Sequence, residues 1–127
     1  MTYLLDTHAF VWMAEGDRRL NSDVRSMIAD KGNEVLLSIA SLWEIAIKVS
    51  IGKLELAAGF SDLVESADSE RYSLFPIDTA SVTMVTTLPL HHRDPFDRLL
   101  AATALQHDVA LISADSVFDL YGVKRVW

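Results

Sequence analysis

Short apolar runs alternate along the chain with longer segments whose apolar residues recur at the spacing of an α-helix. The apolar runs predict β-strands at Thr2–Leu5, Glu34–Ser38, Tyr72–Ile77, Val109–Ser113 and Val123–Val126. The helical spacing and its capping residues predict helices at His8–Glu15, from Ser22 to Gly32, at Ser41–Ile51, at Gly59–Ser69, from Asp78 to about Leu88, from Asp94 to His107, and at Ser116–Tyr121. Strands separated by helical stretches are typical of βαβ units and a parallel sheet.

The predicted strands are apolar throughout, as in sheets that helices cover on both faces. They therefore predict a three-layer α/β/α fold with a central parallel sheet of four or five strands. Pro76 favours an edge position for the strand at Tyr72–Ile77, because proline has no amide hydrogen to donate to a neighbour. The length of 127 residues indicates one domain that spans residues 1–127.

The chain carries 11 Lys and Arg residues against 18 Asp and Glu residues, a formal net charge of −7. This balance argues against a protein that holds DNA or an anionic membrane by a general positive charge. The absence of cysteine excludes disulfides, thiolate zinc sites and cysteine nucleophiles. The longest uncharged run, Thr79–His92, is shorter than the about 18 residues of a membrane-spanning helix, and the first residues lack the basic region of a signal peptide. We therefore expect a cytoplasmic protein without a membrane partner.

Acidic residues gather near the predicted carboxyl ends of the strands, where parallel sheets bind their ligands. Five acids meet this criterion: Asp6 after the first strand, Glu44 in the first predicted turn after the second, Asp78 after the third, Asp97 in the first turn of the helix before the fourth, and Asp115 beyond the fourth. Asp97 reaches the same edge only if the loop before its helix returns there. The spacing alone does not choose among the five.

Each of these acids except Asp6 also has an ordinary structural explanation. Acids favour the caps and first turns of helices, because free backbone amides there donate to them. Glu44 also precedes Lys48 by four residues, the spacing of an exposed ion pair. The positions that capping explains are Ser41 with Glu44 as a capping box, Asp94 with Asp97 in a first turn after it, Asp78, and Asp115. For any one of these acids taken alone, capping is the commoner explanation.

Asp6 is harder to explain in this way, because it ends an apolar strand at the partly shielded edge of the sheet. Carboxylates that converge at such an edge repel one another and raise one another's pKa, unless a cation neutralises them. Oxygen ligands without cysteine, and without histidines at i,i+4 spacing, indicate Mg²⁺ or Mn²⁺ rather than Zn²⁺. Water held on such an ion can attack phosphorus, and the ion can shield phosphodiester oxygens.

Four segments contain the candidate acids: Leu4–His8 (LLDTH), Ser38–Ala46 (SIASLWEIA), His91–Ala102 (HHRDPFDRLLAA), and Ser113–Asp115 (SAD) with Phe118 and Tyr121 beyond it. In this order and at this spacing they resemble the PIN-domain family, and in particular the VapC-type toxins of bacterial type II toxin–antitoxin pairs. The resemblance extends over essentially the whole chain. Each segment alone is weak evidence, and the four together are strong.

The resemblance implies an endoribonuclease that depends on Mg²⁺ or Mn²⁺ and uses metal-activated water to leave a 5′-phosphate and a 3′-hydroxyl. It leaves Asp78 out of the site. The residues that it implies as catalytic and metal-holding are Asp6, Glu44, Asp97 and Asp115. Those that it implies as supporting are Thr7 and Ser113, whose hydroxyls lie beside the acids, and Asp94, the N-cap that orients Asp97.

A cationic run near Asp97 could contact RNA phosphates: His91, His92, Arg93 and Arg98. A solvated loop explains the same run equally well. His8 could steer a phosphate or a proton, although a histidine in the first turn of a helix is more often merely solvated.

Phe10, Trp12 and Trp43 lie in predicted helices that flank the acids. Because Phe10, Val11 and Trp12 are consecutive, at least one of them must face away from the core. An amphipathic antitoxin segment could lie on these side chains and place an arginine at the carboxylates. The resemblance implies such an antitoxin partner and also a homodimer.

Two other functions stay open on the sequence. A non-catalytic binding or regulatory module, acting through its antitoxin complex, would use its acids only as helix caps and would need no metal. A metal-dependent phosphatase or DNA nuclease would share the metal chemistry and differ in its substrate. Metal dependence and a panel of substrates separate these functions from a ribonuclease.

Overall fold

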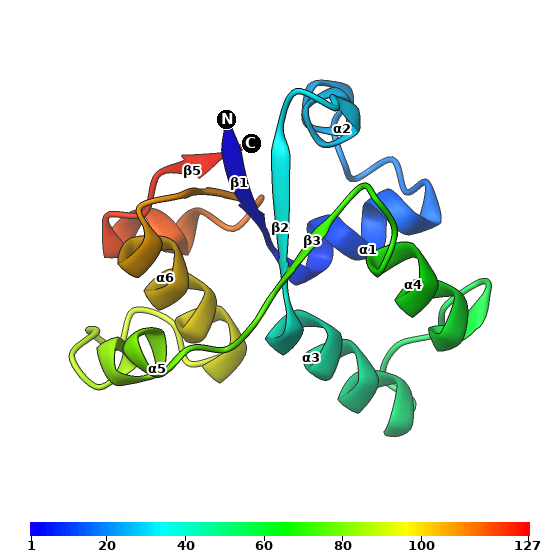
Figure 1. Ribbon diagram of the computed structural model, residues 1–127. Helices are drawn as coiled ribbons and strands as arrows, with labels where there is room; N and C mark the ends of the chain where they lie inside the picture. The colour runs from blue at the N-terminus through cyan, green and yellow to red at the C-terminus, as the bar shows by residue number, and fades with distance from the viewer.

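Five parallel strands form one sheet at the centre of the computed structural model, which describes residues 1–127 (Figure 1). The strands are β1 Thr2–Leu5, β2 Glu34–Ser38, β3 Ser73–Phe75, β4 Ala110–Ile112 and β5 Arg125–Val126. Their order in the sheet is β3-β2-β1-β4-β5, and every neighbouring pair is parallel. The predicted three-layer α/β/α fold is confirmed, with five strands, and β3 lies at the edge that Pro76 favours.

Helices connect the strands and cover the sheet. They are α1 Thr7–Glu15, α2 Ser22–Ala29, α3 Ile39–Ser50, α4 Gly59–Ala67, α5 Thr79–Val85, α6 Pro95–His107 and the 3₁₀-helix η1 Ser116–Tyr121. Figure 1 shows α1 and α4 on one side of the sheet and α5 and α6 on the other. None of these helices combines the length and apolar character that crossing a membrane would require.

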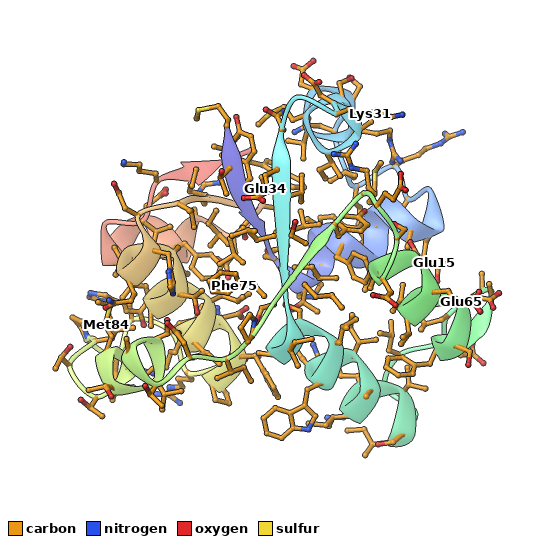
Figure 2. The ribbon with its side chains drawn as sticks, in the orientation of Figure 1. Glu15, Lys31, Glu34, Glu65, Phe75 and Met84 are labelled. Atoms are coloured by element: carbon orange, nitrogen blue, oxygen red, sulfur yellow. The ribbon has the colours of Figure 1, made fainter.

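The strands are apolar at consecutive positions because both faces of the sheet are buried. In the register of β1 with β2, Leu4 pairs with Leu36, and Leu5 pairs with Leu37. The face that packs against α1, α2, α3 and α4 carries Tyr3, Leu5, Val35, Leu37 and Ile112. The face that packs against α6 and η1 carries Leu4, Leu36 and Leu111. Charged side chains such as Lys31, Glu34 and Glu65 are exposed, and Figure 2 shows Lys31 and Glu65 at the periphery of the molecule.

Helix α3 begins earlier than the sequence predicts. Ser38 is its N-cap, and the Ser38 hydroxyl accepts a hydrogen bond from the Ala40 amide at 3.1 Å. The expected capping box of Ser41 and Glu44 is therefore wrong, because the helix already contains Ser41. Glu44 lies in the second turn, where it has no free amide to cap.

Helix α1 turns only one of its three consecutive large side chains into the core. Phe10 is completely buried and packs edge-on against the ring of Tyr72 at 5.3 Å, whereas Val11 and Trp12 are half-buried. The proposal of Phe10 as part of a binding groove is therefore wrong, since the core already encloses its side chain. Trp12 and Trp43 keep exposed surface.

Replacing Phe10 by alanine should lower the free energy of unfolding by about 3–5 kcal/mol, because it leaves a cavity in the larger of the two cores. Trp43→Ala should cost only about 1 kcal/mol, because Trp43 is largely exposed and loses mainly its contact with Phe96. Urea denaturation followed by circular dichroism measures both. Equal losses for the two variants would contradict this account of α1.

Candidate functional site

The chain places Asp6 at the carboxyl end of the central strand β1. Its Oδ1 accepts a hydrogen bond from the Ala9 amide at 2.7 Å and so caps α1, and its Oδ2 accepts one from the Ser113 hydroxyl. The side chain is buried, and this burial raises its pKa, although the hydrogen bonds from Ser113 and Ala9 oppose the rise. Asp6 is thus both a helix cap and an anion held out of water.

The two predicted supporting hydroxyls behave differently. Ser113, at the end of β4, donates to Asp6 and accepts a hydrogen bond from the Asp115 amide at 3.0 Å, so it joins two of the candidate acids. Thr7 donates instead to the hydroxyl of Ser41 on α3, at 3.0 Å. Sequence reasoning did not assign Ser41 to the site, although its position in the Ser38–Ala46 segment placed it near Glu44.

Glu44 is only 2% exposed, so the expectation of an exposed ion pair with Lys48 is wrong. Its Oε2 lies 2.8 Å from the Lys48 Nζ, and its buried Oε1 accepts no hydrogen bond. A buried carboxylate oxygen without a donor is costly, since nothing replaces the water that it lost. Such an oxygen indicates a ligand position.

Asp97 lies in the first turn of α6, and the loop before this helix does return to the carboxyl edge of the sheet. Asp94 is the N-cap of α6, with its Oδ1 accepting from the amides of Phe96 at 2.8 Å and Asp97 at 3.2 Å. Burial, followed by the negative charge of Asp94, raises the pKa of Asp97 to about 7. The charges of Glu44 and Asp6 contribute to this rise, while His92 opposes it. Asp97 is therefore close enough to three other acids to sense their charge.

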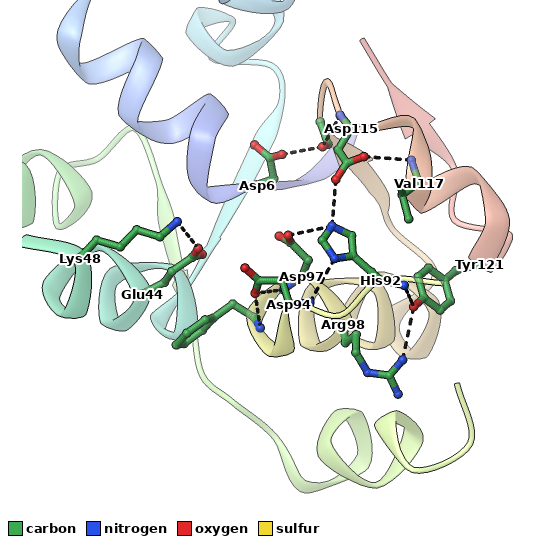
Figure 3. A network of polar contacts seen from close by, with 12 residues as sticks. Asp6, Glu44, Lys48, His92, Asp94, Asp97, Arg98, Asp115, Val117 and Tyr121 are labelled. Carbon is green, nitrogen blue, oxygen red and sulfur yellow. Dashed lines mark hydrogen bonds and ion pairs between the residues drawn. The ribbon is translucent and has the colours of Figure 1, made fainter. Parts of the chain in front are cut away.

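The ring of His92 joins Asp97 to Asp115 (Figure 3). Its Nε2 lies 3.1 Å from the Asp97 Oδ2 and 3.0 Å from the Asp115 Oδ2. The other Asp115 oxygen accepts from the Val117 amide at 3.0 Å and caps η1. The sequence placed His92 among the candidate RNA contacts. The tertiary structure places it between two acids, and no signal in the sequence distinguishes it from its neighbour His91.

The other residues of the cationic run face away from the acids or hold the loop. Arg98 donates to the carbonyl oxygens of Pro89 at 2.9 Å and Val85 at 3.1 Å, so its guanidinium fixes the segment between α5 and α6. His91 packs against the ring of Tyr121 at 5.1 Å and, like Arg93, is exposed. Of the four candidates for RNA contact, His91 and Arg93 have accessible side chains that no ion pair engages.

Asp78 is not part of this cluster. It caps α5 through the Ser81 amide and lies 2.8 Å from the Nε2 of His107, the last residue of α6. Asp97 lies in the first turn of the same helix. Ten residues therefore separate Asp97 from His107, or roughly 15 Å at the rise of an α-helix. A position directly after a strand is therefore not sufficient to bring an acid into the cluster. Asp78 follows β3, and β3 is at the edge of the sheet.

The two tryptophans that the sequence assigned to a binding groove lie in different surroundings. Trp43 is 58% exposed and packs edge-on against Phe96 at 5.2 Å, where α3 meets the start of α6. Trp12 is half-buried, with the ring of His8 at 5.8 Å and the Arg19 guanidinium over it at 5.0 Å. His8 is exposed and contacts none of the acids through a hydrogen bond.

The donor set fits a hard divalent cation. Carboxylate oxygens predominate, and one of them is buried without a donor. Burial, and then the neighbouring negative charges that a cation would neutralise, raise the pKa of Asp97. His92, Asp97 and Asp115 bring one nitrogen and two oxygen atoms within 4.8 Å of one another. These groups together can bind a cation at this edge of the sheet.

Asp97→Asn should stabilise the metal-free protein, and more strongly at about pH 8 than at about pH 5. The folded-state pKa of Asp97 is about 7 against its ordinary value of 3.8, so the wild type loses stability as the pH rises through this interval, by roughly 4 kcal/mol in all, of which about a third is already lost at about pH 5. Calorimetry in EDTA should therefore show the variant melting above the wild type at both pH values, with the larger difference at the higher pH. A lower melting temperature at about pH 8 would show that Asp97 acts mainly as a structural anion.

Comparisons with known proteins identify the family and the fold of this chain. The family model of the PIN domain matches residues 3–124. The chain is 25% identical over 114 residues to Ribonuclease VapC22 of Mycobacterium tuberculosis, a match that covers 90% of this chain and 87% of that protein. Its fold is similar to VapBC2 from Rickettsia felis bound to a DNA fragment from their promoter, with a TM-score of 0.73, 13% identity, and coverage of 99% of this chain and 98% of that one. It is also similar to VapBC-1 from nontypeable Haemophilus influenzae, with a TM-score of 0.68, 14% identity, and coverage of 99% and 97%. The chain therefore belongs to the PIN-domain family.

Proposed function

We propose that this protein is a divalent-metal-dependent endoribonuclease and the toxin of a toxin–antitoxin pair. One observation carries the proposal: Glu44 and Asp97 are shielded from water next to Asp6 and Asp115, and neither of them caps a helix. Carboxylates that are shielded from water, in spite of the free-energy cost of removing their hydration, are typical of a site that binds a cation.

The alternative of a non-catalytic module explains only part of the cluster. Asp6, Asp94 and Asp115 do cap helices, as that alternative expects. Capping does not explain Glu44 and Asp97, which pair with Lys48 and His92 instead, and it does not account for the unpaired Glu44 Oε1. The enzyme is therefore the better explanation.

The residues that would hold the metal are Asp6, Glu44, Asp97 and Asp115, and their oxygen atoms favour Mg²⁺, with Mn²⁺ as a substitute. When bound, such an ion supplies an activated water molecule and neutralises charge on the phosphodiester. The protein's own groups orient the ligands. Ser113 and the Ala9 amide fix both oxygens of Asp6, and the Asp94 cap fixes the first turn of α6.

An RNA substrate is supported by the ribonuclease name of the M. tuberculosis relative and by a cavity beside the acids. The cavity has a volume of about 370 Å³ and adjoins Thr7. No acid lines it, and its basic side chains are His8, Arg19, Lys48 and Lys53. In a protein with a net charge of −7, this concentration of basic groups offers a local contact for RNA phosphates.

An antitoxin partner is supported by the solved structures with the same fold, which are VapBC complexes. The exposed Trp43 and its neighbour Phe96 offer apolar surface at the start of α6. A helix laid on this surface could place a basic side chain at the acids, since a guanidinium binds carboxylates well. The homodimer that the sequence resemblance implies stays a prediction.

RNA cleavage by the purified protein should require Mg²⁺ or Mn²⁺ and stop in excess EDTA. Asp6→Asn and Asp97→Asn should each lower the rate at least about 10²-fold, because they weaken the hold on the ion that activates water. A fluorescent single-stranded RNA measures the rate, and a DNA strand and a phosphate monoester test the other substrates. Full activity in EDTA would exclude the metal mechanism.

Asp78→Asn is the matched control for these variants. Asp78 also caps a helix and also pairs with a histidine, but it lies at the other end of α6. Because asparagine caps about as well as aspartate, the variant should keep nearly full activity. A loss comparable to that of Asp97→Asn would show that the acids were assigned wrongly.

Trp43→Ala and Trp12→Ala should weaken binding of the antitoxin encoded by the neighbouring gene by at least about 10-fold, as expected for aromatic side chains at the centre of an interface. Val82→Ala, an exposed apolar residue on α5, is the control. Surface plasmon resonance with folded variants measures the dissociation constants. Unchanged affinity for both tryptophan variants would place the antitoxin elsewhere.

A further inference from the structure

We propose that His92 is a positioning residue, which holds Asp97 and Asp115 through its Nε2–H group and does not itself bind the metal. The inference rests on the proposed function, because it concerns how the metal-holding acids are oriented. Distance alone makes His92 a possible third ligand, since its Nε2 is close to both carboxylates. The hydrogen bond on the other side of the ring argues for a different role.

The Asp94 backbone amide decides which nitrogen of His92 carries the proton. It donates to the His92 Nδ1 at 3.2 Å. A backbone amide can only donate, so Nδ1 presents its lone pair and the ring proton is on Nε2. The Nε2–H group then donates to the two acids and has no lone pair to offer a metal. Coordination through Nε2 would require a proton on Nδ1, directly facing the Asp94 amide hydrogen.

The ring also lacks the freedom to swing out of the way. The His92 backbone amide donates to the Tyr121 hydroxyl at 2.9 Å, and the side chain is only 19% exposed. Arg98 reaches the same hydroxyl at 3.4 Å and holds the preceding loop by its carbonyl oxygens. Figure 3 shows these contacts as one chain from Arg98 through Tyr121 to His92 and the acids.

The Nε2–H group of His92 fixes the direction of the carboxylate oxygens that remain free. Without it, two like-charged oxygens within 4.8 Å of each other would repel, and each side chain could rotate. With it, one oxygen of Asp97 is held by His92, and Asp115 is held by His92 and by the Val117 amide. The remaining Asp97 oxygen is left in a fixed direction. Donors that orient metal-binding carboxylates in this way are typically worth about 10–100-fold in metal affinity.

Calorimetric titration of the RNA-free protein with Mn²⁺ tests the proposal. His92→Ala should weaken Mn²⁺ binding about 10–100-fold, whereas His92→Gln should bind close to the wild-type value, because its amide can donate from a similar position. His107→Ala is the matched control, since His107 also pairs with an aspartate and lies at the far end of α6. It should leave the affinity unchanged. Unchanged or tighter binding by His92→Ala would overturn the proposal.

Electron spin-echo spectroscopy of the Mn²⁺-loaded protein separates a positioning residue from a ligand. The wild type should show no directly coordinated imidazole nitrogen. A strong ¹⁴N coupling that disappears in His92→Gln would overturn the proposal and make His92 a ligand. If the wild type binds Mn²⁺ and cleaves RNA, and the His92→Ala variant binds Mn²⁺ with the same affinity, only this inference fails. If the wild type binds no Mn²⁺, the proposed function fails together with it.

Discussion

The free-energy cost of holding several carboxylates close together and partly out of water is the constraint on which the rest of this site depends. Asp97 illustrates it most clearly, because burial in the first place, and then the charges of three neighbouring acids, raise its pKa to about 7. Side-chain donors reduce this cost: Ser113 for Asp6, Lys48 for Glu44, and His92 for both Asp97 and Asp115. These donors leave the Glu44 Oε1 unsatisfied, and a bound cation would complete the set.

The sheet order brings these acids together. Because β1 lies between β2 and β4, the residues that follow these three strands meet at one edge. Asp6 and Asp115 come directly from that arrangement, and Glu44 comes from the second turn of α3. Asp97 arrives from a helix that runs back along the sheet, after a loop that Arg98 and Tyr121 hold. Sites built on strand ends and helix starts in this way are more rigid than sites built on loops.

Some of these acids stabilise the fold and also belong to the proposed site. Asp6, Asp94 and Asp115 each use one oxygen to cap a helix, which anchors the side chain and aims the group at the edge. A helix cap and a metal-holding acid are therefore compatible roles for one carboxylate. Capping therefore holds for Asp115, and also for Asp6, where the sequence did not suggest it, but it does not explain Glu44 or Asp97.

The sequence by itself determined the fold class and the order of strands and helices, because apolar spacing and capping are local properties of the chain. Strand ends marked five candidate acids, and the resemblance to the PIN-domain family selected four of them. The sequence did not determine the start of α3, where the Ser38 hydroxyl competes successfully with Ser41 for the cap. Nor did it show that Phe10 is buried, that Asp78 pairs with His107, or that His92 rather than His91 lies between two acids. Only the tertiary structure decided these points, because each depends on contacts between residues far apart in the chain, and local spacing carries no information about such contacts.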